Sequence, residues 1–414
     1  MLNHRYYHQR VEQTLDFIIP KDKKVLYIDT SGKLKKNNKS NGKYDFIYLN
    51  GTLGKSQDLV GLLSNLQKYC HPSTRLLIYQ HNHLWQWILT LSEKLGLKRR
   101  EGVQNWLSVA DTSVYLSGCG YEVTRVFRRT ICPIFAFGLG PAVNATGVIL
   151  PFFDFFKLDQ FILARPLPEL FPGTSPNSLT VCITVRNEKE NIEKIVRSLP
   201  IVCENQEILF VEGHSTDGTR QEIERVIKKY PSKNVRVIGQ PGKGQGDAIR
   251  VGFKDAKGEI IILYEGDGTS DPGDLKYFYD SMRQGRFEFI EGSRFVYPLV
   301  SEAMPFTNKL GNIFFARWFS FFLGQRTTDV LSGIKAILKR DYDCLYARWG
   351  FLGLQDPFGD FELLYGAARM GLKFGEVPMR YYPRVYGVSK SNVIKHGLYL
   401  LRMAAKGYLI FRSQ

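Results

Sequence analysis

A short apolar run that ends in two carboxylates constrains this chain more than any other stretch of its sequence. Residues 260–272 read IIILYEGDGTSDP, so five apolar or aromatic side chains lead directly into Glu265, Gly266 and Asp267. A run of this length, bounded by turn residues, is typical of a buried strand in a parallel sheet. In open α/β sheets, ligands bind just beyond the carboxyl ends of such strands. We therefore predict an α/β fold whose functional site includes Glu265 and Asp267.

The Glu265 and Asp267 pair has the chemistry of a metal site. Carboxylate oxygens suit a hard divalent cation that keeps some of its waters and bridges diphosphate oxygens, and Gly266 lets the backbone come close. We expect Mg²⁺ or Mn²⁺ there. Taken alone, an acid-glycine-acid triplet is more often a simple acidic turn, because short motifs match by chance. The rest of the chain has to decide between these interpretations.

Composition and charge narrow the class of protein and its partners. The 414 residues are enough for two or three domains, and 44% hydrophobic with 23% charged residues is typical of a folded protein. The net charge of +16 favours an anionic partner, which could be a nucleic acid, a phosphorylated substrate or an acidic membrane surface. The six cysteines are scattered without a CxxC pair, so we expect neither a zinc site nor a disulfide framework.

Two stretches bear on where the protein acts. The N-terminus, MLNHRYYHQR, lacks the apolar core of a signal peptide, which predicts a cytoplasmic protein. Residues 131–153 carry no charge over the length of a membrane span. Pro133, Pro141 and Pro151, together with several glycines, would interrupt a helix there, so we predict that this segment does not span a membrane.

The first part of the chain alternates strand and helix. We predict strands at 25–28, 45–49 and 75–79, with helices at 57–70 and 84–95, which indicates an α/β layer. Residues 20–166 resemble the second half of a class I S-adenosylmethionine-dependent methyltransferase domain. YDFIYLNGTLGKSQDLVGLLSNLQKYCHPSTRLLIY is similar to its strand–helix–strand unit, and NWLSVADTSVYLSGCGYEVTRVF to its closing helix and β-hairpin.

The cofactor-binding half of such a domain is missing. These enzymes hold their cofactor with a glycine-rich turn after the first strand, whereas here that strand continues as VLYIDTSGKL. Residues 33–43 are too few for the helix, strand and helix that the cofactor half needs. We therefore predict that residues 1–166 are a degenerate methyltransferase-like domain and that S-adenosylmethionine is not a cofactor. Binding of another ligand by Asp29 and Asp45 is a weaker alternative, because close backbone approach needs glycine.

A proline-rich linker, residues 167–178, follows and predicts a domain boundary. Beyond it, strands at 179–185, 207–211 and 235–238 alternate with helices, and the loop QPGKGQGDAIRVGF places three glycines around Lys243 ahead of a helix. Loops that combine glycines, a lysine and the amides of a helix N-terminus form a concave anion site.

Residues 179–404 resemble an inverting family 2 glycosyltransferase of the branch that contains dolichyl-phosphate mannose synthase and bacterial polyprenyl-phosphate sugar transferases. The resemblance rests on an ordered series of motifs: TVRNEKENI, VEGHSTDGT, GKGQGDAIRVGF, AKGEIIILYEGDGTSDPGDL, EGSRF, TTDVLSGIKAILKR and GLKFGEVPMRYYPRVYGVSKSN. An ordered series is far more specific than one motif, so it favours the metal site over the acidic turn. It implies a Rossmann-like, mostly parallel nucleotide-diphospho-sugar transferase domain over residues 179–392.

The resemblance also implies roles on the donor side. Asp267, with Glu265, would hold the metal on the diphosphate of the nucleotide sugar, and the other nucleotide contacts would come from Asn187, Glu188, Glu212 and Lys243. Glu265 and Glu212 stand where the family usually has aspartate, so whether the donor is GDP- or UDP-linked stays open. Asn187 could instead cap a helix, and Lys243 could be a solvated loop charge.

On the acceptor side, the resemblance points to positive charges that would bind a phosphate and to carboxylates that could act as a base. The first group comprises Arg294, Arg384 and Lys390, with the neutral hydroxyl of Ser389 among them, and is bordered by Asp329, which could also cap a helix. Asp360 and Glu362 are the candidate bases. A lipid phosphate is already anionic near neutral pH and needs no base, whereas a glycan hydroxyl does.

We also predict contact with a membrane surface. Residues 310–323, LGNIFFARWFSFFL, are too short to span and are strongly apolar. In the expected C-terminal amphipathic helix, 393–414, Lys395, Arg402 and Lys406 lie opposite Val393, Leu400, Ala404 and Phe411, as in a helix lying on anionic lipid. The alternative is that both helices cover the core.

Together these patterns predict a metal-dependent, inverting enzyme that transfers a hexose from a nucleotide sugar to a polyprenyl phosphate at the inner face of the cell membrane. Transfer to a glycan hydroxyl and a membrane-associated scaffold without activity are the alternatives. No nucleic-acid-binding module is recognisable, so we expect no nucleic acid partner.

Overall fold

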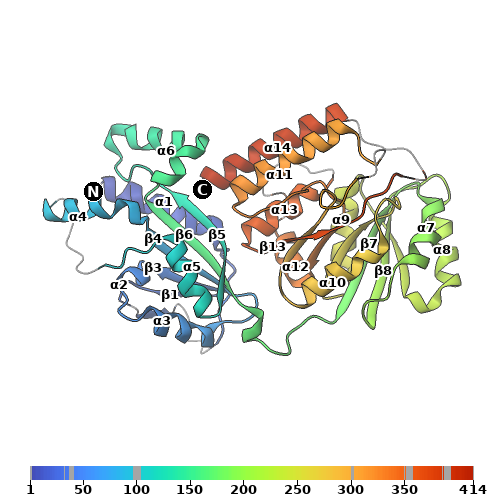
Figure 1. The fold of residues 1–414 in the computed structure, drawn as a ribbon, viewed down its shortest axis with the longest axis horizontal. Helices are drawn as coiled ribbons and strands as arrows, with labels where there is room; N and C mark the ends of the chain where they lie inside the picture. The colour runs from blue at the N-terminus through green and yellow to red at the C-terminus, as the bar shows by residue number, and fades with distance from the viewer. Residues whose placement is uncertain are drawn as a thin grey trace. The chain divides into compact units, whose positions relative to one another are not determined.

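The computed structural model of the chain describes residues 2–31, 33–36, 42–96, 104–299, 303–348, 350, 358–384, 386 and 393–413. They form two compact units (Figure 1). The first comprises Met1–Thr174 and Leu409–Gln414, and the second comprises Ser175–Tyr408. The division lies within the proline-rich segment.

The first unit is built on a six-stranded sheet in the order β2-β1-β3-β4-β6-β5. Strands β1, β3 and β4 are parallel, β2 is antiparallel to β1, and β6 is antiparallel to both β4 and β5. The strand bounds are β1 Val25–Ile28, β2 Leu34–Lys36, β3 Phe46–Asn50, β4 Arg75–His81, β5 Tyr121–Arg129 and β6 Asp159–Pro166.

Helices cover this sheet and bury an aliphatic core. Leu63 and Leu66 pack with strand residues such as Leu26, Ile47 and Ile78 in one buried cluster. The helix bounds are α1 Leu2–Ile18, α2 Thr52–Lys55, α3 Leu59–Leu66, α4 Gln86–Lys94 and α5 Val109–Gly118, with short 3-10 turns η1 Gln67–Tyr69, η2 His83–Trp85 and η5 Pro168–Leu170. The predicted likeness of this unit to a methyltransferase stays a prediction.

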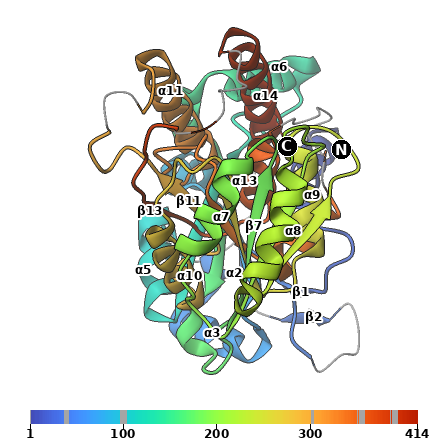
Figure 2. The same ribbon diagram turned by 90° about the vertical axis from the view of Figure 1, so that its right-hand side faces the viewer.

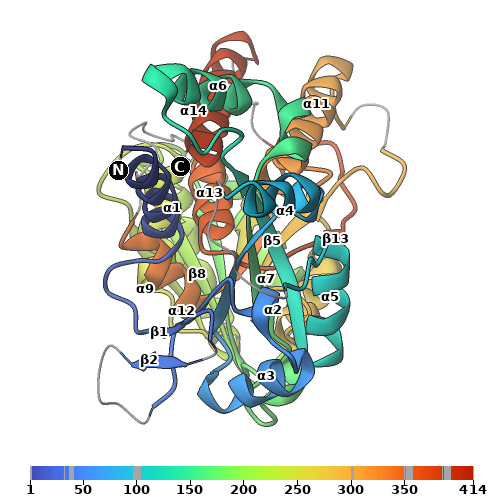
Figure 3. The same ribbon diagram turned by 90° about the vertical axis from the view of Figure 1, so that its left-hand side faces the viewer.

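A long excursion joins the neighbouring strands β5 and β6. It contains η3 Ala136–Gly138, α6 Leu139–Ile149 and η4 Pro151–Phe156 (Figure 3). Pro141 lies in the first turn of α6 and Pro151 opens η4, positions where proline is tolerated because it loses no helical hydrogen bond there. Across the described residues, we find no helix with enough length and apolar character for a membrane span.

The second unit is built on a seven-stranded sheet in the order β13-β11-β12-β10-β7-β8-β9. Strands β10, β7, β8 and β9 are parallel, and β12 is antiparallel to its neighbours β10 and β11. The bounds are β7 Ser178–Val185, β8 Asn205–Glu212, β9 Val235–Gly239, β10 Ile260–Glu265, β11 Phe289–Ser293, β12 Lys335–Leu338 and β13 Phe374–Pro378. The predicted buried strand that ends at Glu265 is therefore confirmed as β10.

Helices lie on both faces of this sheet, as Figure 2 shows for α7 and α9 beside β7. Val181 and Ile183 of β7 pack into one cluster with Ile192 of α7 and Phe278 of α10. On the opposite face α9 approaches closely, since a Cβ at Gly252 would lie 2.5 Å from Sγ of Cys182. The bounds are α7 Lys189–Ser198, α8 Thr219–Lys229, α9 Gln245–Asp255, α10 Leu275–Arg283, α11 Phe306–Leu323, α12 Lys339–Tyr346, α13 Asp360–Arg369 and α14 Val393–Ser413, with η6 Pro231–Lys233 and η7 Pro272–Asp274.

The C-terminal helix α14 corrects one sequence expectation. Leu400, Ala404 and Phe411, which we placed on a face open to lipid, are buried. That face covers protein, because an amphipathic helix gains most by burying its apolar stripe in the core. Among the described side chains of α14, Leu398, Leu401 and Leu409 are the exposed leucines.

Candidate active site at the carboxyl edge of the second sheet

A cavity of about 730 Å³ opens where the parallel strands of the second sheet end. Its volume is within the range typical of small-molecule sites. Five residues predicted from the sequence line it, namely Glu188, Lys243, Glu265, Asp267 and Arg384. The position agrees with the rule that ligands bind at the carboxyl ends of strands in α/β sheets.

Glu265, the last residue of β10, is held in a tight space. A Cβ at Gly333, in the loop before β12, would lie 1.9 Å from Cδ of Glu265, so only glycine fits there. Burial raises the pKa of the Glu265 carboxyl to about 8, and the negative charge of Asp267 adds to this effect. The glycine of TTDVLSG thus lets its loop pass directly over the carboxylate.

Asp267 is fixed by its own loop and by an arginine. Its Oδ1 accepts hydrogen bonds from the backbone N (3.1 Å) and the Oγ1 (2.7 Å) of Thr269. Its Oδ2 lies 2.7 Å from Nη2 of Arg384, whose Nη1 lies 3.0 Å from Oε1 of Glu188. The guanidinium of Arg384 therefore bridges the carboxylates that follow β7 and β10.

Lys243 lies on the loop between β9 and α9. The loop is held by Asp247, which accepts a hydrogen bond from the backbone N of Gly242 (2.7 Å) and pairs with Arg250 (2.6 Å). Gln240 donates to the carbonyl of Gly242 (3.0 Å). Lys243 itself is exposed, so it can reach an anion in the cavity.

Asn187 and Glu212 do not line the cavity: Asn187 joins the loop after β7 to the loop after β8, and Glu212 braces the loop after β8. Oδ1 of Asn187 accepts from the backbone N of Thr216 (2.8 Å), and Oε1 of Glu212 accepts from the backbone N of Ser215 (2.5 Å). Asn187 has a left-handed backbone (φ 54°), and the N-cap of α7 is Glu188, so Asn187 is not a helix cap. Both side chains support the shape of the site without lining it.

Arg294 and Asp329 form a buried pair with each other. Nε and Nη2 of Arg294 lie 2.6 and 2.7 Å from the two carboxylate oxygens of Asp329, and the backbone N of Arg294 also donates to this group (3.1 Å). Neither residue lines the cavity. Asp329 caps no helix, because β12 follows it. The pair ties the end of β11 to the loop before β12.

The two candidate bases, both in the first turn of α13, point to different places. Oδ1 of Asp360 lies 3.0 Å from Nζ of Lys335, while Oε2 of Glu362 accepts from the backbone N of Gly350 (3.2 Å). Glu362 lines a separate small cavity together with Arg369. Neither carboxylate lines the candidate active site. Ser389 and Lys390 lie outside the described residues.

Sequence reasoning missed several residues of this site. His214, Gln240, Phe358 and His396 also line the cavity. Lys335, which does not line the cavity, is fully buried and donates to the carbonyl of Ser332 (2.5 Å). A lysine inside the apolar strand IKAIL was the signal for such a buried ion pair, whereas the cavity-lining role of His214 has no comparable signal.

Comparison with known proteins identifies a domain in the second unit. The sequence model described as glycosyl transferase family 2 matches residues 180–344. The second unit carries a family 2 glycosyltransferase domain. The family predicted from the ordered motifs is thereby confirmed.

Several curated relatives of this family 2 glycosyltransferase domain come from archaea. Glycosyltransferase AglJ of Haloferax volcanii is 29% identical over 218 residues, which cover 51% of this chain and 66% of AglJ. A dolichol-phosphate mannosyltransferase of Pyrococcus furiosus is 29% identical over 134 residues, covering 32% of this chain and 37% of the relative. A dolichyl-phosphate hexose transferase of Haloferax volcanii is 26% identical over 50% of this chain and 84% of the relative. The chain thus spans less than two thirds of the first two relatives.

Solved structures overlap the chain more loosely. The match to glucosyl-3-phosphoglycerate synthase of Mycobacterium tuberculosis covers 56% of this chain and 78% of the synthase, with 14% sequence identity and a TM-score of 0.39. The same enzyme in complex with Mn²⁺, UDP-glucose and glycerol 3-phosphate overlaps with a TM-score of 0.40.

Proposed function

We propose that the second unit transfers a hexose from a GDP- or UDP-linked sugar to a polyprenyl phosphate, with inversion and with a divalent metal. One observation carries the proposal. The cavity at the carboxyl edge brings the acid pair Glu265 and Asp267 together with two cations, Lys243 and Arg384. Carboxylates and cations in one cleft suit a metal-bound diphosphate donor and an anionic acceptor.

The carboxylates of this site fit a metal whose remaining ligands come from the substrate and from water. Within the described part of the chain, no cluster of three His, Cys, Asp or Glu side chains could hold a metal by itself. Glu265 and Asp267 supply carboxylate oxygens, and Mg²⁺ or Mn²⁺ commonly completes its shell with water and phosphate oxygens. When bound, such a metal neutralises the charge that develops on the leaving diphosphate.

The residues of the chain would supply positioning and charge. An acceptor phosphate oxygen attacks the anomeric carbon as the bond from that carbon to the diphosphate oxygen breaks, and the nucleoside diphosphate leaves. Lys243 would bind the diphosphate, and Arg384 would orient the acceptor phosphate through its planar fork. An anionic acceptor has no proton to lose, which agrees with the placement of Asp360 and Glu362 outside the cavity.

We further propose that the protein acts at the inner, anionic face of the cell membrane. The net charge of +16 favours anionic lipid. In α11, Phe306, Leu310, Phe314 and Phe321 are exposed. Apolar side chains on a basic protein suit peripheral contact with such a surface.

One experiment tests the reaction. The purified full chain is incubated with Mn²⁺, a panel of nucleotide sugars, and either a short polyprenyl phosphate or the matching polyprenyl alcohol, and the products are weighed by mass spectrometry. We expect a sugar adduct on the phosphate alone. Asp267→Asn should lower kcat/KM by roughly a thousandfold because it weakens the metal site, whereas Asp343→Asn, a matched change of an exposed carboxylate on α12, should not.

The other outcomes exclude the proposal. Adducts on the polyprenyl alcohol alone would show that the acceptor group is a hydroxyl, which would favour transfer to a glycan over transfer to a lipid phosphate. If no donor is consumed and neither UDP nor GDP with Mn²⁺ raises the melting temperature, the protein is a scaffold, because a ligand at a hundredfold its Kd should stabilise by about 2.7 kcal/mol.

A further inference from the structure

The excursion between β5 and β6 turns apolar side chains toward solvent. Phe137 is fully exposed (107%), and Phe152 is three-quarters exposed (75%). Its other exposed apolar residues are Ile134, Phe135, Leu139, Val143, Ile149, Leu150, Phe155 and Phe156. Exposed apolar side chains gathered so densely in one segment are rare on a monomeric soluble protein, and such concentrations mark interaction sites.

Asn144 and Asp154 of the excursion face the body of the first unit. Oδ1 of Asn144 accepts from the backbone N of Ile131 (2.6 Å), and its Nδ2 donates to the hydroxyl of Tyr6 in α1 (2.8 Å). Asp154, the only charged residue between 131 and 156, pairs with Arg412 through both oxygens (2.7 Å each) and with Lys157 (2.7 Å). An ordinary surface helix has its apolar stripe inside, so this arrangement is inverted.

The tip of the excursion is built to project. Ala136 and Phe137 have positive φ angles of 42° and 54°, which side-chain-bearing residues rarely adopt. On the inner side, Gly140 and Gly147 allow close packing, since Cβ atoms there would lie 1.8 Å from the carbonyl O of Ile134 and 2.2 Å from Cδ1 of Ile131. Backbone strain of this kind persists where the surrounding structure holds it for a purpose.

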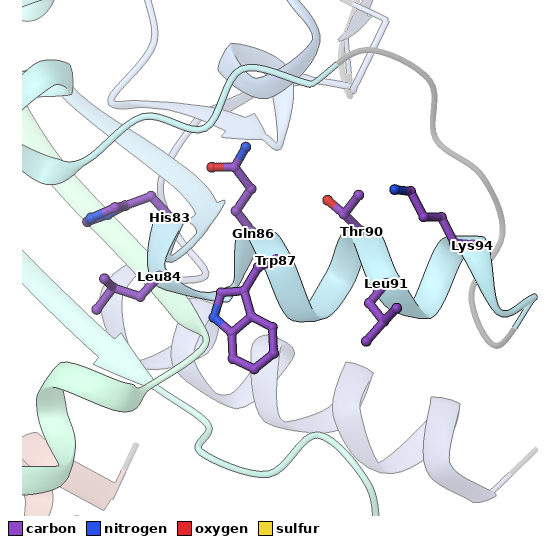
Figure 4. Close-up of a pocket in the computed structure, with 7 residues that line it drawn as sticks. All are labelled: His83, Leu84, Gln86, Trp87, Thr90, Leu91 and Lys94. Carbon is purple, nitrogen blue, oxygen red and sulfur yellow. The ribbon is translucent and has the colours of Figure 1, made fainter.

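Helix α4 follows a turn that is bonded to the excursion. Nε1 of Trp85 donates to the carbonyl of Phe156 (2.9 Å), which joins η2 to η4. Trp87 and Leu91 are exposed, and Figure 4 shows both on one side of α4, with Thr90 and Lys94 on the other. These residues border a hollow of about 700 Å³. We call the exposed apolar residues 134–156 together with Trp87 and Leu91 the apolar platform.

We propose that the apolar platform of the first unit inserts into the interfacial layer of an anionic lipid bilayer. The proposal extends the proposed function, whose acceptor is carried by a lipid. α6 has 11 residues and is too short to span, so the platform would lie in the plane of the interface. Aromatic side chains such as Trp87 are favoured at that depth.

Charge supports a bilayer as the occupant. The carboxylate of Asp154 is neutralised by its two cations, so the platform itself offers no negative charge to repel anionic lipid. The chain carries a net charge of +16, which favours an anionic surface. Asn144 and Asp154 are turned inward, and the exposed apolar side chains suit hydrocarbon, which makes no hydrogen bonds of its own.

Flotation of the full chain with vesicles tests this proposal. Vesicles of phosphatidylcholine with about one third phosphatidylglycerol are compared with pure phosphatidylcholine. We expect binding to the anionic vesicles, and the variant Phe137→Ser/Phe152→Ser/Phe155→Ser should bind at least about a hundredfold more weakly, since each inserted phenylalanine contributes roughly tenfold. The matched variant Val60→Ser/Val114→Ser/Ile201→Ser, at three exposed positions outside the platform, should bind within about twofold of the parent.

Other results overturn the proposal. Equal flotation of the platform variant would place the membrane contact elsewhere, and flotation with neither vesicle would exclude membrane contact. A wild-type dimer in size-exclusion chromatography that the platform variant abolishes would show that the surface joins two copies of the chain. Because these variants leave the active site untouched, the platform variant should keep the wild-type kcat on a short soluble polyprenyl phosphate. If the wild-type protein floats with anionic vesicles but transfers no sugar to any acceptor, the proposed function is refuted and the membrane inference stands.

Discussion

The guanidinium of Arg384 lies 2.7 Å from Oδ2 of Asp267 and 3.0 Å from Oε1 of Glu188. Asp267 is also a candidate metal ligand, so the arginine and a metal compete for the same carboxylate. We expect donor and metal to displace Arg384 from Asp267. The freed guanidinium can then turn to the acceptor phosphate.

Arg384→Ala should separate the two substrates. The KM for the polyprenyl phosphate should rise roughly ten- to hundredfold, because a charge-assisted hydrogen bond contributes about 1.5–3 kcal/mol. Mn²⁺ affinity in the presence of UDP should stay constant or increase, since a competing cation has been removed. Steady-state kinetics and calorimetry measure the two quantities. A fall in Mn²⁺ affinity with an unchanged acceptor KM would contradict this role.

Gly333→Ala should disturb Glu265 directly. The added Cβ would lie 1.9 Å from Cδ of Glu265, so we expect a loss of roughly 1–3 kcal/mol in the free energy of unfolding and a lower kcat. Shortening the neighbour in Glu265→Asp/Gly333→Ala should recover part of the stability. Gly311→Ala in α11 is the control, because its added Cβ would point into open space and alanine favours a helix. Urea denaturation of the parent and the three variants gives the comparison.

The raised pKa of Glu265 predicts a pH dependence of stability. Its folded-state pKa is about 8, above the ordinary value of 4.5, so the folded protein holds a proton that the unfolded chain has lost between these values. The contribution of Glu265 is full below about pH 4.5 and is lost as the pH rises through about 8, at no more than about 1.4 kcal/mol per pH unit. In metal-free buffer, Glu265→Gln should remove this decline. Parallel curves for the two proteins would show that Glu265 does not titrate in this range.

Asp360→Asn and Glu362→Gln test whether a base is needed. With a polyprenyl phosphate acceptor, Glu362→Gln should keep kcat within about threefold, because an anionic nucleophile needs no proton removed. Asp360→Asn should instead cost roughly 3 kcal/mol of stability, because it leaves the buried charge of Lys335 less well paired. Rates with folded protein and melting curves distinguish these effects. A collapse of kcat in Glu362→Gln would favour the hydroxyl acceptor.

The local sequence pattern was enough to predict strand β10 and five of the residues that line the cavity of the second unit. The apolar run that ends at Glu265 became β10, and the acid pair, Glu188, Lys243 and Arg384 line one cavity. These residues follow strand ends or precede helices, where sequence position and spatial position are closely linked. By contrast, Arg294 and Asp329 pair with each other although 35 residues separate them, and no local pattern encodes that partnership.

The sequence by itself determined the order of strands and helices, the acidic strand end and the glycosyltransferase motifs, because backbone periodicity and turn chemistry act over a few neighbouring residues. Only the tertiary structure decided what each amphipathic face meets. The apolar stripe of α14 that contains Leu400 and Ala404 is buried, whereas the residues around Phe137 are exposed although their segment is equally apolar. Helical spacing determines which side chains share a face, but burial depends on the distant elements packed against that face.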